Sequence, residues 1–242
     1  KEKKRGINYN FLKISGEEAG GIMSGLDAII DSIGTYAKYL KFDLDGQKFF
    51  TRRHATWASR LQVGVGLPYG KNSTALPYIK QYFVGGAYSL RGFRIRTLGP
   101  GSYKFKDTAG AVPTVIDRTG DIKIEFTSEY RFDIVKLFAG AMKLNGAVFA
   151  DAGNIWLAQK SGGFENGEFA FNKLGKDLAI DAGLGIRLDA GFLVARFDFA
   201  TPLKQPNYAD GTGSWKIKDI NLLWDQIKRN DWVFNFAIGY PF

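Results

Sequence analysis

The chain contains no cysteine and a single histidine, His54, among its 242 residues. A disulfide framework and a thiolate metal site are therefore excluded, and one histidine cannot build a histidine-based metal cluster. Apolar runs of about 18 residues are also missing, which argues against membrane-spanning helices. The mean hydropathy of -0.16 agrees with this. A membrane β-barrel is still allowed, because its alternating strands give only a weak hydropathy signal.

Glycine and aromatic residues are abundant instead. The chain has 30 glycines and 15% aromatic residues, which favours a β-rich protein with many turns. Its formal net charge of +9 fits a solvated basic surface, contact with lipid head-group phosphates, or a polar interior. Nucleic acid is not an expected partner, since the sequence holds no basic helix, zinc finger or RNA-binding strand motif.

Alternating apolar and polar residues predict about eight β-strands. The clearest covers residues 121–133, where Ile124 and Phe126 share one face and Glu125 and Glu129 line the other. The other predicted strands cover residues 7–15, 36–50, 57–67, 142–156, 178–189, 192–201 and 232–242.

A soluble β-sandwich also alternates in this way, but three features favour a membrane barrel. The polar face carries charges on most of the clear strands. The strands run to about ten residues, against a mode of about five to six in globular sheets. The connections alternate long and short, as in outer-membrane barrels. We therefore predict an all-β fold, a transmembrane antiparallel β-barrel with about eight strands in this chain. The long connections are 17–34, 70–120, 158–176 and 205–230, and the short ones are 53–54, 135–141 and 190–191.

The connection 70–120 is too long for an ordinary loop, because structureless loops rarely exceed about fifteen residues. It contains Gly85-Gly86 and then Leu90-Arg91-Gly92-Phe93. Glycine permits close backbone approach, and arginine offers a planar fork for a buried carboxylate. The sequence thus predicts a loop that folds back and docks its arginines against acidic residues. The candidate partners on the polar strand faces are Glu125, Glu129, Asp151 and Asp181.

With these motifs the chain resembles the BamA/TamA superfamily of outer-membrane assembly factors. The hallmark loop pattern, Val/Ile-Arg-Gly-Phe/Tyr, corresponds to Leu90-Arg91-Gly92-Phe93, in which leucine is a conservative departure. The matching strand motifs are Ile-Glu-Phe at 124–126 and Phe-Ala-Asp-Ala-Gly at 149–153, and the chain ends on Phe242. The similarity covers roughly residues 36–242, and the three motifs in this order are together quite specific.

The resemblance implies that residues 1–242 form the C-terminal half of a sixteen-stranded barrel, with the loop 70–120 inserted into its lumen. The first eight strands and the periplasmic POTRA repeats of such proteins are then absent from this sequence. In the lumen, Arg91 is expected to pair with Glu125 and Asp151, and Phe93 is expected near Phe149. Three further arginines are expected to pair with neighbouring carboxylates: Arg131, Arg187 and Arg196. The implied site residues are the loop motif Leu90, Arg91, Gly92 and Phe93, its lumen partners Glu125, Phe149, Asp151 and Gly153, and the C-terminal seam and assembly signal Phe236, Tyr240 and Phe242.

The implied function is to fold and insert β-barrel proteins into the bacterial outer membrane. Its partners would be unfolded client proteins, membrane lipid, and accessory proteins bound through the absent N-terminal region. Strand addition at a seam exchanges backbone hydrogen bonds and needs no cofactor, metal or enzymatic step. Two alternatives remain open, a two-partner-secretion translocation pore and a barrel-embedded hydrolase. A hydrolase would need a serine near His54, which falls at a predicted turn, and the sequence has no Gly-x-Ser-x-Gly elbow.

Overall fold

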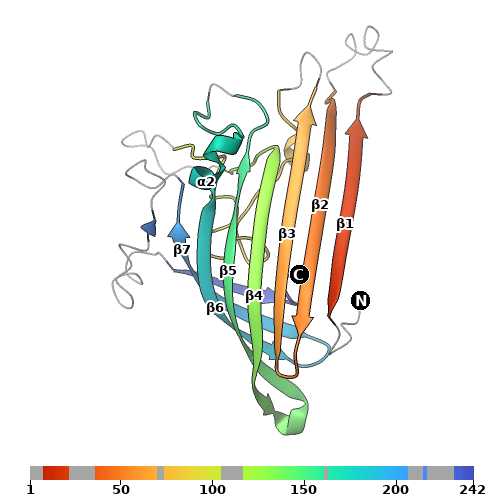
Figure 1. The fold of residues 1–242 in the computed structure, drawn as a ribbon, viewed down its shortest axis with the longest axis vertical. Helices are drawn as coiled ribbons and strands as arrows, with labels where there is room; N and C mark the ends of the chain where they lie inside the picture. Colours follow the sequence, from red (N-terminus) through yellow and green to blue (C-terminus); the bar gives the residue numbers. More distant parts are fainter. Residues whose placement is uncertain are drawn as a thin grey trace.

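The computed structural model of the chain describes residues 8–21, 36–69, 74–104, 117–160, 163–206, 215–216 and 232–242. These residues form one antiparallel sheet of eight strands, which neighbour one another in sequence order (Figure 1). Each strand coincides with one of the eight predicted strands, so the all-β class is confirmed. The strands are β1 (Tyr9–Ala19), β2 (Tyr39–Thr51), β3 (Ala55–Pro68), β4 (Ile122–Leu137), β5 (Met142–Trp156), β6 (Ala179–Asp189), β7 (Val194–Lys204) and β8 (Val233–Ile238).

The helices of the described residues are single turns in the connections between strands. No helix in this part of the chain has both the length and the apolar character that a membrane crossing requires. The helical turns are η2 (Tyr78–Lys80), η3 (Phe138–Gly140), η4 (Phe171–Lys173) and α2 (Leu174–Asp177).

Strands β1, β4 and β7 continue several residues past their predicted ends. β1 reaches Ala19, where the sequence predicted a loop from residue 17, because its backbone still pairs with β2. Glu17 is held there by the Tyr39 hydroxyl, which donates to its carboxylate at 2.6 Å. β4 continues to Leu137 through a β-bulge between Asp133 and Val135. Backbone pairing thus persists where the side-chain alternation becomes irregular.

The predicted strand 232–242 is wrong at its C-terminal end, because β8 stops at Ile238. The next residue, Gly239, has a φ of 90°, a left-handed conformation that glycine adopts without a steric penalty. The chain therefore leaves the sheet at this point. Phe236 stays on the exposed outer face, whereas Tyr240 and Phe242 do not continue the strand.

The two faces of the sheet differ sharply in polarity. The outer face carries large apolar side chains that remain exposed, while charged residues on the inner face of β4–β7 are buried. An exposed apolar surface of this extent is uncommon in soluble monomers and is typical of a lipid-facing barrel wall. The exposed outer side chains include Phe42, Trp57, Phe126, Tyr130, Leu184, Phe199, Phe234, Phe236 and Ile238.

The sheet is open in the described residues, since β1 pairs with β2, β8 pairs with β7, and the two end strands do not meet. The lower ends of β6, β7 and β8 curve behind β3–β5, so the inner face is concave (Figure 1). The described parts of the loop 70–120 pack against this face. A buried apolar cluster joins the two, formed by Val84, Leu90, Phe93 and Leu98 of the loop with Ile155 of β5 and Ala179 of β6.

Parts of the predicted connections lie outside the described residues. These are most of the loops 17–34 and 205–230, the middle of the loop 70–120, and the first seven residues of the chain.

Candidate functional site

The candidate site is where residues 74–104 and 117–120, here called the arginine loop, meet the inner face of the sheet. The loop tip is a tight reversal around Leu90–Phe93, because Gly86 N–H donates to the Phe93 carbonyl at 2.8 Å. A second backbone bond runs from Phe93 N–H to the Leu90 carbonyl at 3.2 Å. Arg91 lies in this reversal, and its side chain is fully buried.

Arg91 is held by carboxylates from two neighbouring strands. Its Nε and Nη2 donate to the two oxygens of Asp151 on β5, both at 2.8 Å. Its Nη1 donates to Oε2 of Glu129 on β4 at 2.5 Å. The guanidinium carbon also lies 3.4 Å from the centre of the Phe149 ring. The side chain is therefore fixed by a two-pronged ion pair, a second carboxylate and an aromatic face.

All three charged side chains of this contact are fully removed from solvent, at 0% exposure. Burial opposes the charged guanidinium, but the carboxylates of Asp151 and Glu129 outweigh it and raise the pKa of Arg91 above its ordinary value. Desolvating such a group of charges is unfavourable, and their attraction offsets it only when the geometry is good. Loss of any one partner would leave an uncompensated buried charge.

Glu129 links the arginine loop to a wider charge network on the wall. Its Oε1 accepts from Arg131 Nε at 2.7 Å and from Arg187 Nη2 at 3.1 Å. Arg187 also pairs with Asp198 at 2.7 Å, and Asp198 pairs with Arg196 at 3.0 Å. The expectation that these three wall arginines pair with neighbouring carboxylates is confirmed. One glutamate thus serves three arginines, which the sequence did not predict.

The expected pairing of Arg91 with Glu125 is wrong. Glu125 instead accepts from the Ser89 hydroxyl at 2.6 Å and pairs with Lys123 at 2.9 Å. Glu125 still contacts the arginine loop, at Ser89, which precedes Arg91 by two residues. Glu125 and Glu129 share one face of β4 and lie about 13 Å apart along it. The alternation shows that both side chains point inward. It does not show how far along β4 the arginine loop reaches, and so which of the two glutamates meets Arg91.

The expected contact between Phe93 and Phe149 is also wrong. Phe93 packs in the apolar cluster of the loop with Leu90 and Leu98. Phe149 instead faces the guanidinium of Arg91. A ring under a buried guanidinium gives it a favourable contact where water has been removed.

Close approach between loop and wall depends on glycine. A Cβ atom at Gly92 would overlap the side chain of Asp181 on β6, and it would lie 3.2 Å from the carbonyl carbon of Thr201. A Cβ at Gly153 would overlap the Ile124 carbonyl oxygen of the neighbouring strand β4, and it would also lie 3.2 Å from Cδ1 of Leu90 in the loop. The glycine of the loop motif is therefore required by contact with β6.

The arginine loop also contacts the last strand. Asn235 of β8 donates its amide to the Arg91 carbonyl at 2.8 Å, and the Tyr88 hydroxyl donates to the Ile238 carbonyl at 2.5 Å. Next to these, Arg196 donates to the Ala87 carbonyl. The same loop segment therefore holds β4 and β5 on one side and β8 on the other.

The three predicted C-terminal residues separate in the structure. Phe236 lies on the outer face of β8, with its ring centroid 5.2 Å from that of Phe197. Tyr240 and Phe242 instead turn to the inner side, where their ring centres lie 4.5 and 5.4 Å from the guanidinium carbon of Arg131. Only Phe236 keeps the orientation that the alternation predicted.

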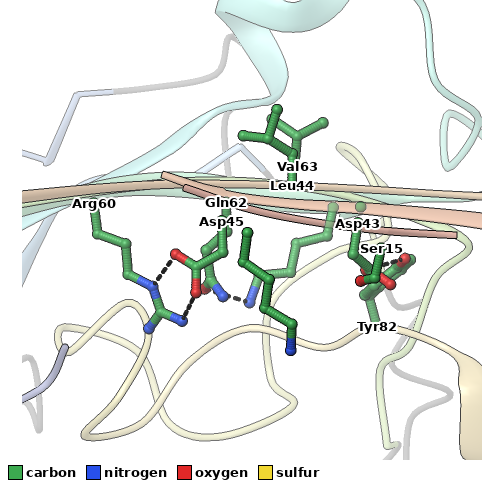
Figure 2. A pocket seen from close by; sticks show the side chains of 11 residues that line it. Ser15, Asp43, Leu44, Asp45, Arg60, Gln62, Val63 and Tyr82 are labelled. Atoms are coloured by element: carbon green, nitrogen blue, oxygen red, sulfur yellow. Dashed lines mark hydrogen bonds and ion pairs between the residues drawn. The ribbon is translucent and has the colours of Figure 1, made fainter. Parts of the chain in front are cut away.

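A polar cavity of about 300 Å³ lies between the loop and the inner faces of β1–β3. Figure 2 shows the Arg60–Asp45 ion pair on one side of it and Tyr82 with Asp43 on the other. Arg60 binds Asp45 with two hydrogen bonds of 2.9 and 2.7 Å, and the Tyr82 hydroxyl donates to Asp43 at 2.6 Å. Along β1–β3 the arginine loop therefore leaves an open space against the inner face of the sheet.

His54 lies in the turn between β2 and β3, where the sequence placed it. Its side chain is exposed, and Nδ1 lies 3.7 Å from an Asp133 carboxylate oxygen. Within the described residues, no group of three His, Cys, Asp or Glu side chains is arranged to hold a metal ion. The contacts described on this wall are pairings of fixed charges and of backbone groups.

A comparison with protein families agrees with this architecture. The model of the Omp85 superfamily domain matches residues 19–242, which is most of the chain. The resemblance inferred from the loop and strand motifs is thereby confirmed. Proteins of this superfamily are outer-membrane β-barrels that assemble or transport other proteins, and they are not enzymes. On the evidence of this match, the chain belongs to the Omp85 superfamily.

Proposed function

We propose that this chain is the C-terminal barrel region of an assembly factor that folds and inserts β-barrel proteins into the outer membrane. The observation that carries the proposal is the position of Arg91. Its side chain is bound to β4 and β5, and its backbone carbonyl is bound to Asn235 on β8. The loop therefore braces the strand at the edge of the sheet.

β8 is suited to act as a seam. It pairs with β7 through six residues, whereas β6 pairs with β7 through ten. An edge strand offers unpaired backbone donors and acceptors to another chain. A strand of a client protein can add to such an edge by β-augmentation. The arginine loop would keep the edge in place while this exchange of backbone hydrogen bonds proceeds.

The outer face supplies the second partner of the proposal, the membrane. Its exposed aromatic and aliphatic side chains would face the acyl chains of the outer membrane. Unfolded barrel proteins are the proposed clients, and accessory proteins would bind through regions upstream of this chain. The reaction proposed here is non-covalent and uses no cofactor.

The test is insertion of a client barrel into liposomes that contain the purified protein with Arg91→Ala. We expect the initial rate of client folding to fall at least about tenfold, because loss of the buried ion pairs frees the loop from β4 and β5. The matched control is Arg60→Ala, which removes a two-pronged ion pair from β3 and leaves the contacts of Arg91 in place. Wild-type insertion by the Arg91 variant would reject the proposal.

The same liposomes distinguish the translocation-pore alternative. Transport of a soluble polypeptide into the liposomes, without insertion of client barrels, would replace assembly by translocation as the function. The polar cavity beside β1–β3 is the feature on which that alternative would depend.

A further inference from the structure

The outer face of the sheet carries one row of polar side chains, on the strands β1–β4. Each residue of the row is the cross-strand partner of the next, so all of them lie at one level of the sheet. Figure 2 shows Leu44 and Val63, which share this outer face, pointing away from the polar cavity on the inner side. The row, here called the polar row, consists of Asn10, Lys48, Ser59 and Ser128.

The polar row lies at the lower edge of an apolar surface. Lys48 precedes Arg52, at the turn between β2 and β3, by four residues, which is about 13 Å along the strand. The short turns lie at the lower end of the sheet, and in outer-membrane barrels they face the periplasm (Figure 1). On the other side of the row, the outer positions of the same strands are apolar and include Leu12, Ile14, Phe42, Leu44, Leu61, Val63, Ile124 and Phe126. The row is therefore placed near the head groups of the periplasmic leaflet.

An aromatic row lies between the polar row and the turn. Phe50, Trp57 and Tyr130 are cross-strand partners in that order and are 46%, 55% and 49% exposed. Aromatic girdles of this kind mark the membrane–water interfaces of outer-membrane barrels. Lys48 turns toward this girdle, since its Nζ lies 4.8 Å from the centre of the Phe50 ring. A lysine on a lipid-facing wall extends to the interface in this way, because its charge is costly in the hydrocarbon.

Lys48 is the one charged side chain at the outer positions of β2–β8 in the described part of the chain. Its cross-strand partners, Asn10 and Ser59, cannot neutralise it. The polar row ends at β4, because the residues that continue it on β5 and β6 are Ala150 and Ala182. The row is therefore a local patch and not a polar belt around the whole wall.

The two serines of the row leave one hydroxyl donor unused. Trp57 donates its indole N–H to Ser128 Oγ at 2.8 Å, and the Oγ atoms of Ser128 and Ser59 lie 3.2 Å apart. One serine donates to the other, so the second hydroxyl proton is left to face the lipid. The ammonium of Lys48 and the amide N–H groups of Asn10 add further donors. A fitting ligand therefore carries a negative charge and several acceptor oxygens.

We propose that the polar row binds the head group of an anionic phospholipid in the periplasmic leaflet. Lys48 binds the phosphate, and the serine pair donates to an ester carbonyl, which lies deeper in the leaflet. The wall has the same order of depth, because the Lys48 ammonium turns toward the girdle while the serines border the apolar surface. A net negative head group is preferred, since the row has no carboxylate to pair with the ammonium group of a zwitterionic lipid.

The experiment measures which phospholipid contacts Trp57, with bromine atoms on the acyl chains near the ester as contact quenchers of tryptophan fluorescence. The full chain is placed in phosphatidylcholine vesicles that contain either brominated phosphatidylglycerol or brominated phosphatidylcholine. Subtracting the signal of Trp57→Phe isolates this tryptophan from the others. We expect phosphatidylglycerol to bind about fivefold more tightly, the attraction that one basic residue contributes near an anionic surface. Equal binding of the two lipids would overturn the proposal.

The matched variants are Lys48→Gln and Lys13→Gln, which remove the same charge from the outer and the inner face of neighbouring strands. Lys48→Gln should abolish the preference, whereas Lys13→Gln and Lys48→Arg should retain it. An equal loss in the two glutamine variants would assign the effect to general attraction by the net charge of +9 and would contradict the site. Heat-modifiable gel migration reports whether each variant is folded.

Two further arms test the ligand. Ether-linked phosphatidylglycerol lacks the ester carbonyls, so it should bind wild type at least about twofold more weakly than the ester form, and replacing both serines by alanine should remove this difference. Equal binding of the two forms to wild type would reject the role of the serines. Inorganic phosphate at constant ionic strength should not displace the lipid; displacement would show a site for free anions and overturn the proposal. The vesicles contain no client protein, so the result does not depend on the proposed function.

Discussion

The inner wall of the sheet has two regions with the same alternating sequence and different environments. Along β4–β7 the arginine loop covers the wall, and Glu129, Asp181 and Arg187 are fully buried. Along β1–β3 a polar cavity remains, and the side chains of Arg60 and Asp45 are 19% and 20% exposed. This difference in the burial of charged side chains comes from the arginine loop, because the strands of both regions alternate in the same manner.

Removing a charge should affect stability differently in the two regions. A solvent-accessible ion pair is screened and contributes about 0–1 kcal/mol. A buried pair contributes little as a pair, but removing one partner destabilises by about 3–5 kcal/mol because the other charge stays buried. The β4–β7 region should therefore respond to single substitutions far more strongly than the β1–β3 region.

The largest effect is expected for Glu129→Gln. The change keeps the shape of the side chain but removes the charge that Arg91, Arg131 and Arg187 share. We expect a loss of about 3–5 kcal/mol in the free energy of unfolding. Urea-induced unfolding in lipid vesicles measures it. A loss below about 1 kcal/mol would show that water reaches the covered region, and the contrast between the regions would not hold.

A smaller effect is expected for Gly92→Ala, which tests how closely the loop approaches the wall. The new Cβ would overlap Asp181, so the loop tip must move away from β6. Overpacking of this kind typically destabilises by about 1–3 kcal/mol. Protease cleavage within the loop should become faster in the same variant.

The matched control for Gly92→Ala is Gly163→Ala, where an added Cβ would have no atom within 4 Å. Its stability should stay within about 0.5 kcal/mol of wild type. An equal loss in the two variants would mean that the effect is a general property of glycine replacement and not of the contact between loop and wall.

The sequence predicted the strands and their two faces because alternation is a local property. The alternation and the long loop offered four inward carboxylates for the loop arginines, and the resemblance to the BamA/TamA superfamily implied Asp151 as a partner of Arg91, which the structure shows. The sequence could not distinguish Glu125 from Glu129, because both share one face of β4 and the choice depends on how deep the loop reaches.

The course of residues Tyr240–Phe242 was predicted incorrectly for a different reason. The apolar alternation runs without interruption from Trp232 to Phe242, so the sequence predicts a continuous strand. The structure interrupts it at Gly239, whose positive φ turns the chain inward. The attraction of Tyr240 and Phe242 to Arg131 is a contact between residues more than a hundred positions apart. No local pattern contains such information.

The smallest effect is expected for Asp45→Asn, which removes a charge of the same kind from the β1–β3 region. Asp45 accepts two hydrogen bonds from Arg60, as Asp151 does from Arg91, so the two pairs match in geometry. Because water reaches Arg60 and can solvate it after the change, we expect a loss of about 0–1 kcal/mol. The same urea titration measures it. A loss as large as that of Glu129→Gln would mean that the β1–β3 wall is covered as completely as the β4–β7 wall, and burial by the arginine loop would no longer explain the difference between them.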